Sequence, residues 1–316
     1  MPISLLCKCG ILLFLISLHQ QGLAQVTGEV NVLDPDVFYM HYTPPNVITD
    51  DFEYQRFSGK LSVPPLKNGR LTLYNTFGLD VHLFNYKNNR PEQNSGELNT
   101  FYNLNYSLFA SYAFSERWSV NVFAAPFLLS NLEGSFEEED LRFNGTFFIE
   151  RNFVLKNGGY IRLGLGTAYI TLNGTTQITP ISQAKARFNE QWSMVLGLPN
   201  TYVKWDFHKR NSLKGLFDLN DFSANLNGSS SFGQGVTADR AVFTVVSAGL
   251  EYNHWITQSF GLLLRVTGGL WNSYELRNED NDTAFTFDDD LTQPFVSVGI
   301  KFNPVRELQN RLFPSN

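Results

Sequence analysis

The chain has little cysteine, few charged residues, and no long apolar run after its first 24 residues. Of its 316 residues, 17% are charged and only two are cysteines, Cys7 and Cys9. The body of the chain has no apolar run of about 18 residues, which excludes a transmembrane helix there. The formal net charge of −6 argues against nucleic-acid binding, for which a basic stripe is expected.

Residues 1–24 are predicted to be an export signal. Lys8 precedes the apolar run 11–18, and residues 22–24 (Gly-Leu-Ala) form a small-residue cleavage site. Both cysteines lie ahead of the apolar run, so the mature chain would contain none. That excludes disulfides and thiolate metal sites, and it suits export into an oxidising compartment.

What the chain does contain is alternation. In residues 101–129, apolar side chains occupy every second position on both sides of a turn at 115–117. A side-chain period of two predicts strands, and the three-residue connection predicts an antiparallel hairpin. The alternating apolar residues are Tyr102, Leu104, Tyr106, Leu108, Ala110, Tyr112 and Phe114, then Trp118, Val120, Val122 and Ala124.

The same alternation recurs to Phe302, and the connections sort into two sets. Short connections are expected at residues 64–69, 115–117, 154–159, 189–191, 208–211 and 255–259. Longer, more polar ones are expected at residues 85–100, 130–140, 171–178, 227–239 and 277–290, with 198–200 as a tight exception. A bulge near Asp221 is expected to shift Phe222, Ala224 and Leu226 onto the apolar face.

Alternating short and long connections are typical of an outer-membrane β-barrel. We therefore predict an all-β fold, a closed antiparallel transmembrane barrel of about 14 strands, with 12 as the alternative. Residues 25–48 would form either a first strand or a plug, residues 49–302 the barrel, and residues 303–316 a periplasmic tail. A soluble β-sandwich or propeller is the competing interpretation. Strands longer than the usual five or six residues and aromatic residues beside the short turns weigh against it.

The segment Trp192–Pro199, followed by Tyr202 to Trp205, resembles a feature of an uncharacterised (domain of unknown function) family of Gram-negative outer-membrane β-barrels. The resemblance is diffuse over residues 30–302. It implies the fold and a location in the outer membrane, and no catalytic residue. Val298 to Phe302 is similar to the C-terminal signal read by the barrel-assembly machinery, although the tail after Phe302 departs from that pattern.

Polar residues on the face opposite the apolar one are predicted to line the lumen, because a charge facing lipid is costly. They would line a pore that selects solutes, or they would pair as salt bridges that fill the interior. These pore-lining candidates are Lys60, Asp80, His82, Arg142, Glu150, Arg162, Lys185, Arg187, Lys204, Asp206, Lys214, Asp218, Glu251 and Arg265.

No catalytic, cofactor or metal site is predicted. The mature chain has four histidines, none in a His-x-Ser arrangement, and the spacing His-Glu-x-x-His is absent. Residues 280–282 (Asp-Asn-Asp) begin like a calcium loop, but Phe285 stands where glycine is required. Solvated loop charge is the preferred explanation for this and the other acidic loops.

We expect a non-enzymatic barrel that passes or takes up small solutes. The alternatives are a closed structural or surface-binding barrel acting through its outer loops, and a lipid-modifying enzyme. The expected partners are outer-membrane lipid and lipopolysaccharide, the barrel-assembly machinery and small solutes, and not nucleic acid.

Overall fold

The computed structural model describes residues 37–48, 52–87, 96–133, 136–172, 175–197, 200–232, 236–287 and 294–304. Residues 1–36 and 305–316 lie outside these ranges, so the predicted export signal and most of the predicted tail do too. Among the described residues, no helix is long and apolar enough to cross a membrane.

Fifteen strands make up nearly all of the described chain. They are β1 (Phe38–Ile48), β2 (Phe52–Asn68), β3 (Leu71–Tyr86), β4 (Thr100–Ala113), β5 (Trp118–Ser130), β6 (Leu141–Val154), β7 (Tyr160–Leu172), β8 (Thr175–Arg187), β9 (Trp192–Leu196), β10 (Asn200–His208), β11 (Asn211–Phe232), β12 (Val236–Trp255), β13 (Phe260–Arg277), β14 (Thr283–Thr286) and β15 (Pro294–Phe302). One helical turn, α2 (Gly96–Asn99), and one 3-10 turn, η1 (Glu138–Asp140), interrupt them.

Fourteen of these strands close into one antiparallel barrel, because each pairs with its neighbours in the sequence and β1 pairs with β15. The short strand β14 folds back on β13 outside this ring. Closure confirms the predicted fold class and the larger of the two predicted strand numbers. Phe38–Ile48 is therefore a barrel strand, which was one of the two alternatives for residues 25–48.

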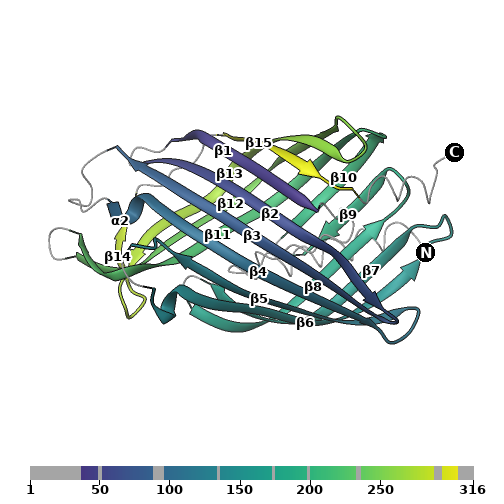
Figure 1. Cartoon of the computed structure of the whole chain (residues 1–316), viewed down its shortest axis with the longest axis horizontal. Helices are drawn as coiled ribbons and strands as arrows, with labels where there is room; N and C mark the ends of the chain where they lie inside the picture. The colour runs from purple at the N-terminus through teal and green to yellow at the C-terminus, as the bar shows by residue number, and fades with distance from the viewer. Residues whose placement is uncertain are drawn as a thin grey trace.

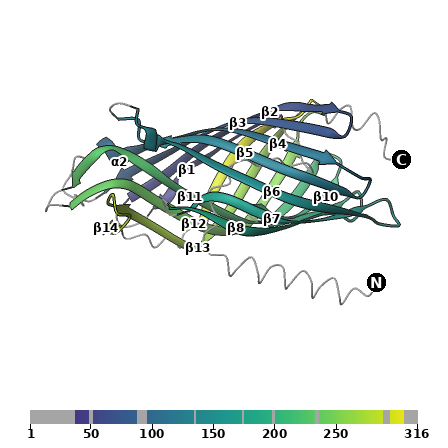
Figure 2. The same ribbon diagram turned by 90° about the horizontal axis from the view of Figure 1, so that it is seen from below.

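The two ends of the barrel differ. We call one the short-turn end, because the tight links between β2 and β3, β4 and β5, and β6 and β7 all lie there. The opposite end, the loop end, carries α2 and β14, as Figure 1 and the view turned by 90° in Figure 2 show.

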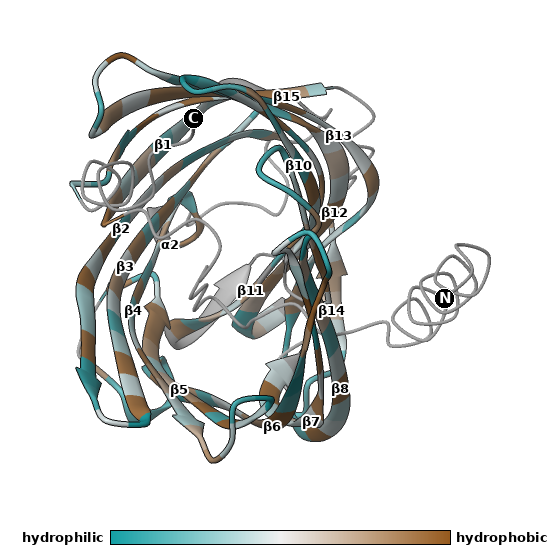
Figure 3. Ribbon diagram, turned by 90° about the vertical axis from the view of Figure 1, so that its right-hand side faces the viewer, coloured by the Kyte–Doolittle hydropathy of each residue, from teal (hydrophilic) through white to brown (hydrophobic). Residues whose placement is uncertain are grey.

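The predicted apolar and polar faces of the strands become the outside and the inside of the barrel. On β13, Leu262, Leu264 and Val266 are exposed on the outside, while Leu263 between the first two and Thr267 after the third are buried. Because alternate side chains point to opposite faces, this pattern gives the barrel an apolar exterior and a polar interior. Figure 3 looks along the barrel from its short-turn end and shows hydrophobic and hydrophilic residues alternating along each strand of an elongated ring.

Three short turns share one hydrogen-bonding scheme. In the central hairpin, the Ser115 hydroxyl accepts hydrogen bonds from the backbone N–H groups of Arg117 and Trp118. The Asn189 side chain accepts from Gln191 and Trp192 in the same way, and Thr257 accepts from the two residues at the same offsets. Residues 114–118 (Phe-Ser-Glu-Arg-Trp) and 188–192 (Phe-Asn-Glu-Gln-Trp) are similar in sequence, and they share this turn chemistry with the turn at Thr257.

This scheme makes a prediction at Asn189. Asn189→Ala removes the acceptor for two backbone donors, at 2.9 and 2.8 Å, and should lower the free energy of unfolding by about 1 kcal/mol. Asn189→Asp keeps the acceptor and should stay within about 0.5 kcal/mol of the parent. Urea unfolding of the barrel in lipid vesicles measures both, and equal losses in the two variants would contradict the assignment.

Several predicted boundaries were wrong. β7 ends at Leu172 and β8 begins at Thr175, while β11 ends at Phe232 and β12 begins at Val236. Most of the expected loops 171–178 and 227–239 is therefore strand, because hairpin pairing continues through their polar residues. β2 likewise runs through Pro64 and Pro65 at a register shift between Val63 and Leu66, where two residues without an N–H can be tolerated.

The prediction of a bulge near Asp221 was also wrong. β11 and β12 stay in regular register from Asn211 to Asn225, and the shift comes only between Asn225 and Ser230. Phe222, Ala224 and Leu226 therefore keep the parity of the inward side chains and are fully buried. This change of face determines what fills the lumen.

Candidate functional site: the interior of the barrel

A polar network occupies the middle of the lumen, with Glu251 at its centre. The Glu251 carboxylate lies 3.5 Å from the ammonium of Lys214 and 3.6 Å from that of Lys301, and it accepts a hydrogen bond of 2.6 Å from Arg265. Its side chain is only 2% exposed. One buried carboxylate thus contacts three cations from β11, β13 and β15, and such a group is stable only while it is paired.

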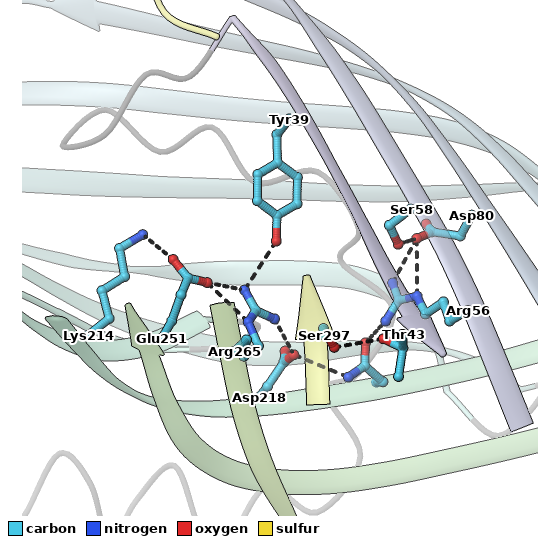
Figure 4. Close-up of polar contacts among 11 residues, drawn as sticks. Tyr39, Thr43, Arg56, Ser58, Asp80, Lys214, Asp218, Glu251, Arg265 and Ser297 are labelled. Carbon is cyan, nitrogen blue, oxygen red and sulfur yellow. Dashed lines mark hydrogen bonds and ion pairs between the residues drawn. The ribbon is translucent and has the colours of Figure 1, made fainter. Parts of the chain in front are cut away.

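The network continues across the lumen (Figure 4). Arg265 also lies 3.4 Å from Asp218, and Asp218 accepts a hydrogen bond from the Asn220 amide at 3.2 Å. The Asn220 carbonyl oxygen accepts from Arg56 on β2, and Arg56 lies 2.7 Å from Asp80 on β3. Because β2 is five strands away from β11 in the ring, the Arg56–Asn220 contact joins two separate parts of the barrel wall.

Toward the loop end, an apolar cluster fills the lumen. We call it the outer cluster, and its members come from eight strands of the ring, from α2 and from the residue after β14. It consists of Phe52, Tyr54, Phe84, Leu98, Phe101, Phe127, Leu129, Phe222, Ala224, Leu226, Ala238, Ala241, Phe243, Val245, Tyr274, Leu276, Phe287 and Phe295. All are buried, so this part of the barrel is packed in the same way as a protein core.

The outer cluster brings opposite walls into contact. The rings of Phe101 and Phe222 lie 5.3 Å apart, although β4 and β11 are seven places apart in either direction around the fourteen-strand ring. Nearby, Ser130 of β5 and Asn225 of β11 form a parallel backbone bridge. In a round barrel of this strand number the two walls would be separated by the lumen. The two walls therefore meet at this level.

The ladder places all fourteen pore-lining candidates at positions with the inward parity. Five of them, Asp80, Lys214, Asp218, Glu251 and Arg265, belong to the polar network. Toward the short-turn end, Glu150 lies 3.8 Å from Arg162, and Lys204 lies 3.2 Å from Asp206.

The remaining five candidates are spread over the wall. The ring nitrogen Nδ1 of His82 is 2.8 Å from the Tyr54 hydroxyl, at the border of the outer cluster. Lys185 is buried, Lys60 and Arg142 are half-buried, and Arg187 is exposed at the short-turn end. The candidates therefore do not form one constellation.

Sequence reasoning missed Arg56 and Lys301. The alternation in the sequence could have identified both residues. Arg56 lies two residues before Ser58 and so shares its polar face, and Lys301 lies on the face opposite Phe302, which makes it an inward residue. The aromatic residues of the outer cluster were missed for another reason. Only polar residues were considered as lumen candidates, whereas Phe84 and Phe101 have the parity of His82 and Asn103 and face inward.

Three of the four described histidines pair with groups other than a serine hydroxyl, while the fourth, His41, is buried and its Nδ1 has no hydrogen-bond partner in the described structure. His82 contacts Tyr54, and His254 lies 2.7 Å from the Asn211 side-chain oxygen, which also accepts from the Tyr252 hydroxyl. His208 accepts from the backbone of Arg210. Within the described ranges, no group of three or more His, Cys, Asp or Glu side chains is arranged to hold a metal ion.

One acidic loop is more ordered than expected. Asp140, at the end of η1, is fully buried rather than solvated. Its carboxylate accepts hydrogen bonds from the Glu137 backbone at 3.0 Å and from the Asn225 amide at 3.2 Å. The acidic segment 137–140 therefore connects the loop end of β11 to the start of β6 at Leu141.

Residues 70–303, most of the chain, match the family described as "Domain of unknown function (DUF6268)". No curated protein matches.

Among solved structures, the outer membrane phospholipase A from Escherichia coli is similar over 85% of this chain and 92% of its own, with 12% identity and a TM-score of 0.36. The NanC porin is similar over 85% and 98%, with 7% identity and a TM-score of 0.35. A porin mutant of Rh. blastica covers 84% and 96%, with 8% identity and a TM-score of 0.29. Similarity at this level carries no information on activity. The chain belongs to the DUF6268 family of unknown function, and it folds as a fourteen-strand barrel of the outer-membrane type.

Proposed function

We propose that the protein is an outer-membrane channel for small solutes whose lumen is closed at rest. The observation that carries the proposal is the contact between opposite walls in the outer cluster, above a lumen lined by charges of both signs. A permanently open pore does not fit rings from β4 and β11 that lie 5.3 Å apart. Passage of a solute therefore requires the outer cluster to separate.

Placement in the outer membrane is supported by the exterior of the barrel. Large apolar side chains are exposed around it, among them Leu165, Leu250 and Leu270. Near the short-turn end the indoles of Trp192 and Trp205 stack on the outside, with ring centroids 5.6 Å apart. Apolar bands bordered by aromatic residues match the lipid face of such barrels. Lipid and lipopolysaccharide would surround it, and the barrel-assembly machinery would insert it.

Polar groups without partners support a path for solutes. On β4, Asn103, Asn105 and Ser107 occupy successive inward positions, are at least nine-tenths buried, and have a side-chain oxygen with no hydrogen-bond partner in the described structure. A buried polar oxygen left unpaired costs free energy, so this wall gains when a polar molecule lies against it. Hydrogen-bonding groups of this kind line channels that pass small polar solutes.

Single-channel recording in planar bilayers tests the proposal. The parent protein should show long closed periods broken by brief openings. Steady conductance from the moment of insertion would contradict the closed resting state. Complete silence at every voltage, in the parent and in variants with a disrupted outer cluster, would contradict the channel.

The second candidate is a closed barrel with a structural or binding role through its loop end. The buried brace of Asp140 and Asn225 favours it, because it stiffens the loop end beside β11. Silence of all variants in the same recordings would select this function. We propose no catalytic role, since His82, His208 and His254 bond to tyrosine, backbone and asparagine groups and the sequence holds no His-x-Ser or His-Glu-x-x-His arrangement.

A further inference from the structure

Arg151 is a charged residue on the outside of the barrel. On β6 the outward positions are occupied by Phe147, Ile149, Arg151 and Phe153, and all four side chains are exposed. The neighbouring residue on β5 is Trp118, which pairs directly with Arg151. A guanidinium on the lipid face is costly in the middle of a bilayer and is tolerated near its surface. The outward position of this charge therefore cannot be explained by a role in the lumen.

The guanidinium is held by two aromatic rings and by no carboxylate. Its central carbon lies 5.1 Å from the centroid of the Trp118 ring and 4.8 Å from that of Phe153. In the described part of the chain no acidic side chain forms an ion pair with it. Stacking on rings fixes the plane of the guanidinium and leaves its N–H donors free for an anion.

The rest of the short-turn end is also basic. Arg117 is exposed in the adjoining turn between β4 and β5. Its backbone oxygen accepts a hydrogen bond of 2.7 Å from the backbone N–H of Asn152, the residue after Arg151. Against the acids Glu116, Glu190 and Asp206, the short turns and their flanks carry eight basic residues. These are Lys67, Arg70, Arg117, Arg151, Lys156, Arg187, Lys209 and Arg210. The acidic runs, by contrast, belong to the loop end.

We propose that Arg151, Trp118 and Phe153, with Arg117 beside them, form a binding site for the phosphate of an anionic phospholipid in the leaflet at the short-turn end. The guanidinium forks onto two phosphate oxygens, while the rings pack against the glycerol and the first methylenes of the acyl chains. The site anchors the depth of the barrel in the membrane. It rests on the proposed membrane location and not on channel activity.

Native mass spectrometry of the folded barrel tests this site. Samples carry phosphatidylglycerol or, as the zwitterionic comparison, phosphatidylcholine. The parent should retain phosphatidylglycerol in preference. Arg151→Gln should weaken that retention about fivefold, the size expected for one basic residue at a membrane surface.

Arg187→Gln is the matched control, because Arg187 is equally basic and exposed at the same end but has the inward parity. It should retain phosphatidylglycerol like the parent. Equal retention by Arg151→Gln and the parent, or an equal loss in Arg187→Gln, would overturn the proposal.

A further arm adds inorganic phosphate, which should not displace the lipid at equimolar concentration, because it lacks the chains that contact Trp118 and Phe153. Displacement would assign the site to free phosphate instead. Folding of each variant into vesicles, followed by circular dichroism, is measured separately. Failure of the parent to insert would contradict the membrane location, whereas a parent barrel that inserts but shows no preference for phosphatidylglycerol would contradict only this site.

Discussion

Phe243→Ala should raise the open probability of the channel by about tenfold to a hundredfold. The Phe243 ring lies 5.3 Å from Phe84, 5.0 Å from Tyr54 and 5.5 Å from Phe222, so it packs against β2, β3 and β11 together. Truncating a buried phenylalanine costs about 3–5 kcal/mol. The contacts of Phe243 across the lumen exist only in the closed state, so losing them destabilises the closed state and not the open one. The substitution therefore shifts the equilibrium toward the open state.

Phe123→Ala is the control for Phe243→Ala. Phe123 is also inward and buried, but it packs in a second cluster with Phe109, Ala125 and Phe148, which lie on β4, β5 and β6. Its truncation should destabilise the barrel to a similar extent without increasing conductance, since these three strands are neighbours in one wall. Equal conductance in Phe243→Ala, Phe123→Ala and the parent would contradict the closed outer cluster.

Glu251→Gln should lower the free energy of unfolding by about 3–5 kcal/mol, the cost of breaking a buried ion pair by removing one partner. The amide leaves Lys214, Arg265 and Lys301 without their shared anion in a dry interior. Urea unfolding in lipid vesicles, with the midpoint and slope fitted together, measures the effect. A second substitution, Lys301→Met, should recover part of the loss, because it removes one of the three cations that lose this carboxylate.

Glu275→Gln is the control for Glu251→Gln. Glu275 also holds an arginine, at 2.8 Å from Arg277, but its side chain is 22% exposed at the loop end. Pairs of that kind contribute about 1 kcal/mol or less. A loss of only that size in Glu251→Gln would show that the polar network is solvated, and the interior would then be an aqueous pore rather than a closed one.

The barrel could be predicted from the sequence because its exterior and interior obey one local rule. A period of two separates Leu262, Leu264 and Val266 from Arg265, and the rule holds whether or not the partner strands are known. The turn acceptors Ser115 and Asn189 are equally local. Strand number and closure followed from the lengths of the connections.

The content of the lumen could not be predicted in the same way. Arg56 and Asn220 are 164 residues apart, and their contact depends on how far the ring is flattened, which no local pattern records. Phe222 shows the second difficulty. An aromatic residue suits lipid and a packed lumen equally well, so its face depends on whether the register shifts before it or, as in this structure, after Asn225.

The central claim is that opposite walls of the barrel meet at the loop end, and a disulfide tests it directly. Ser130→Cys and Asn225→Cys, placed together in a chain begun at Gln25, introduce the only two thiols. Because residues 130 and 225 are bridge partners, they lie within the range that a disulfide can span.

The control pairs Ser130→Cys with Ser212→Cys, which is on the same strand as Asn225 but thirteen residues and about 40 Å further along β11. Mild oxidation of the barrel in vesicles should cross-link the first pair rapidly, leave the second unlinked, and hold the channel shut until a reductant is added. Failure of the Ser130→Cys, Asn225→Cys variant to cross-link in a folded barrel would contradict the closed lumen.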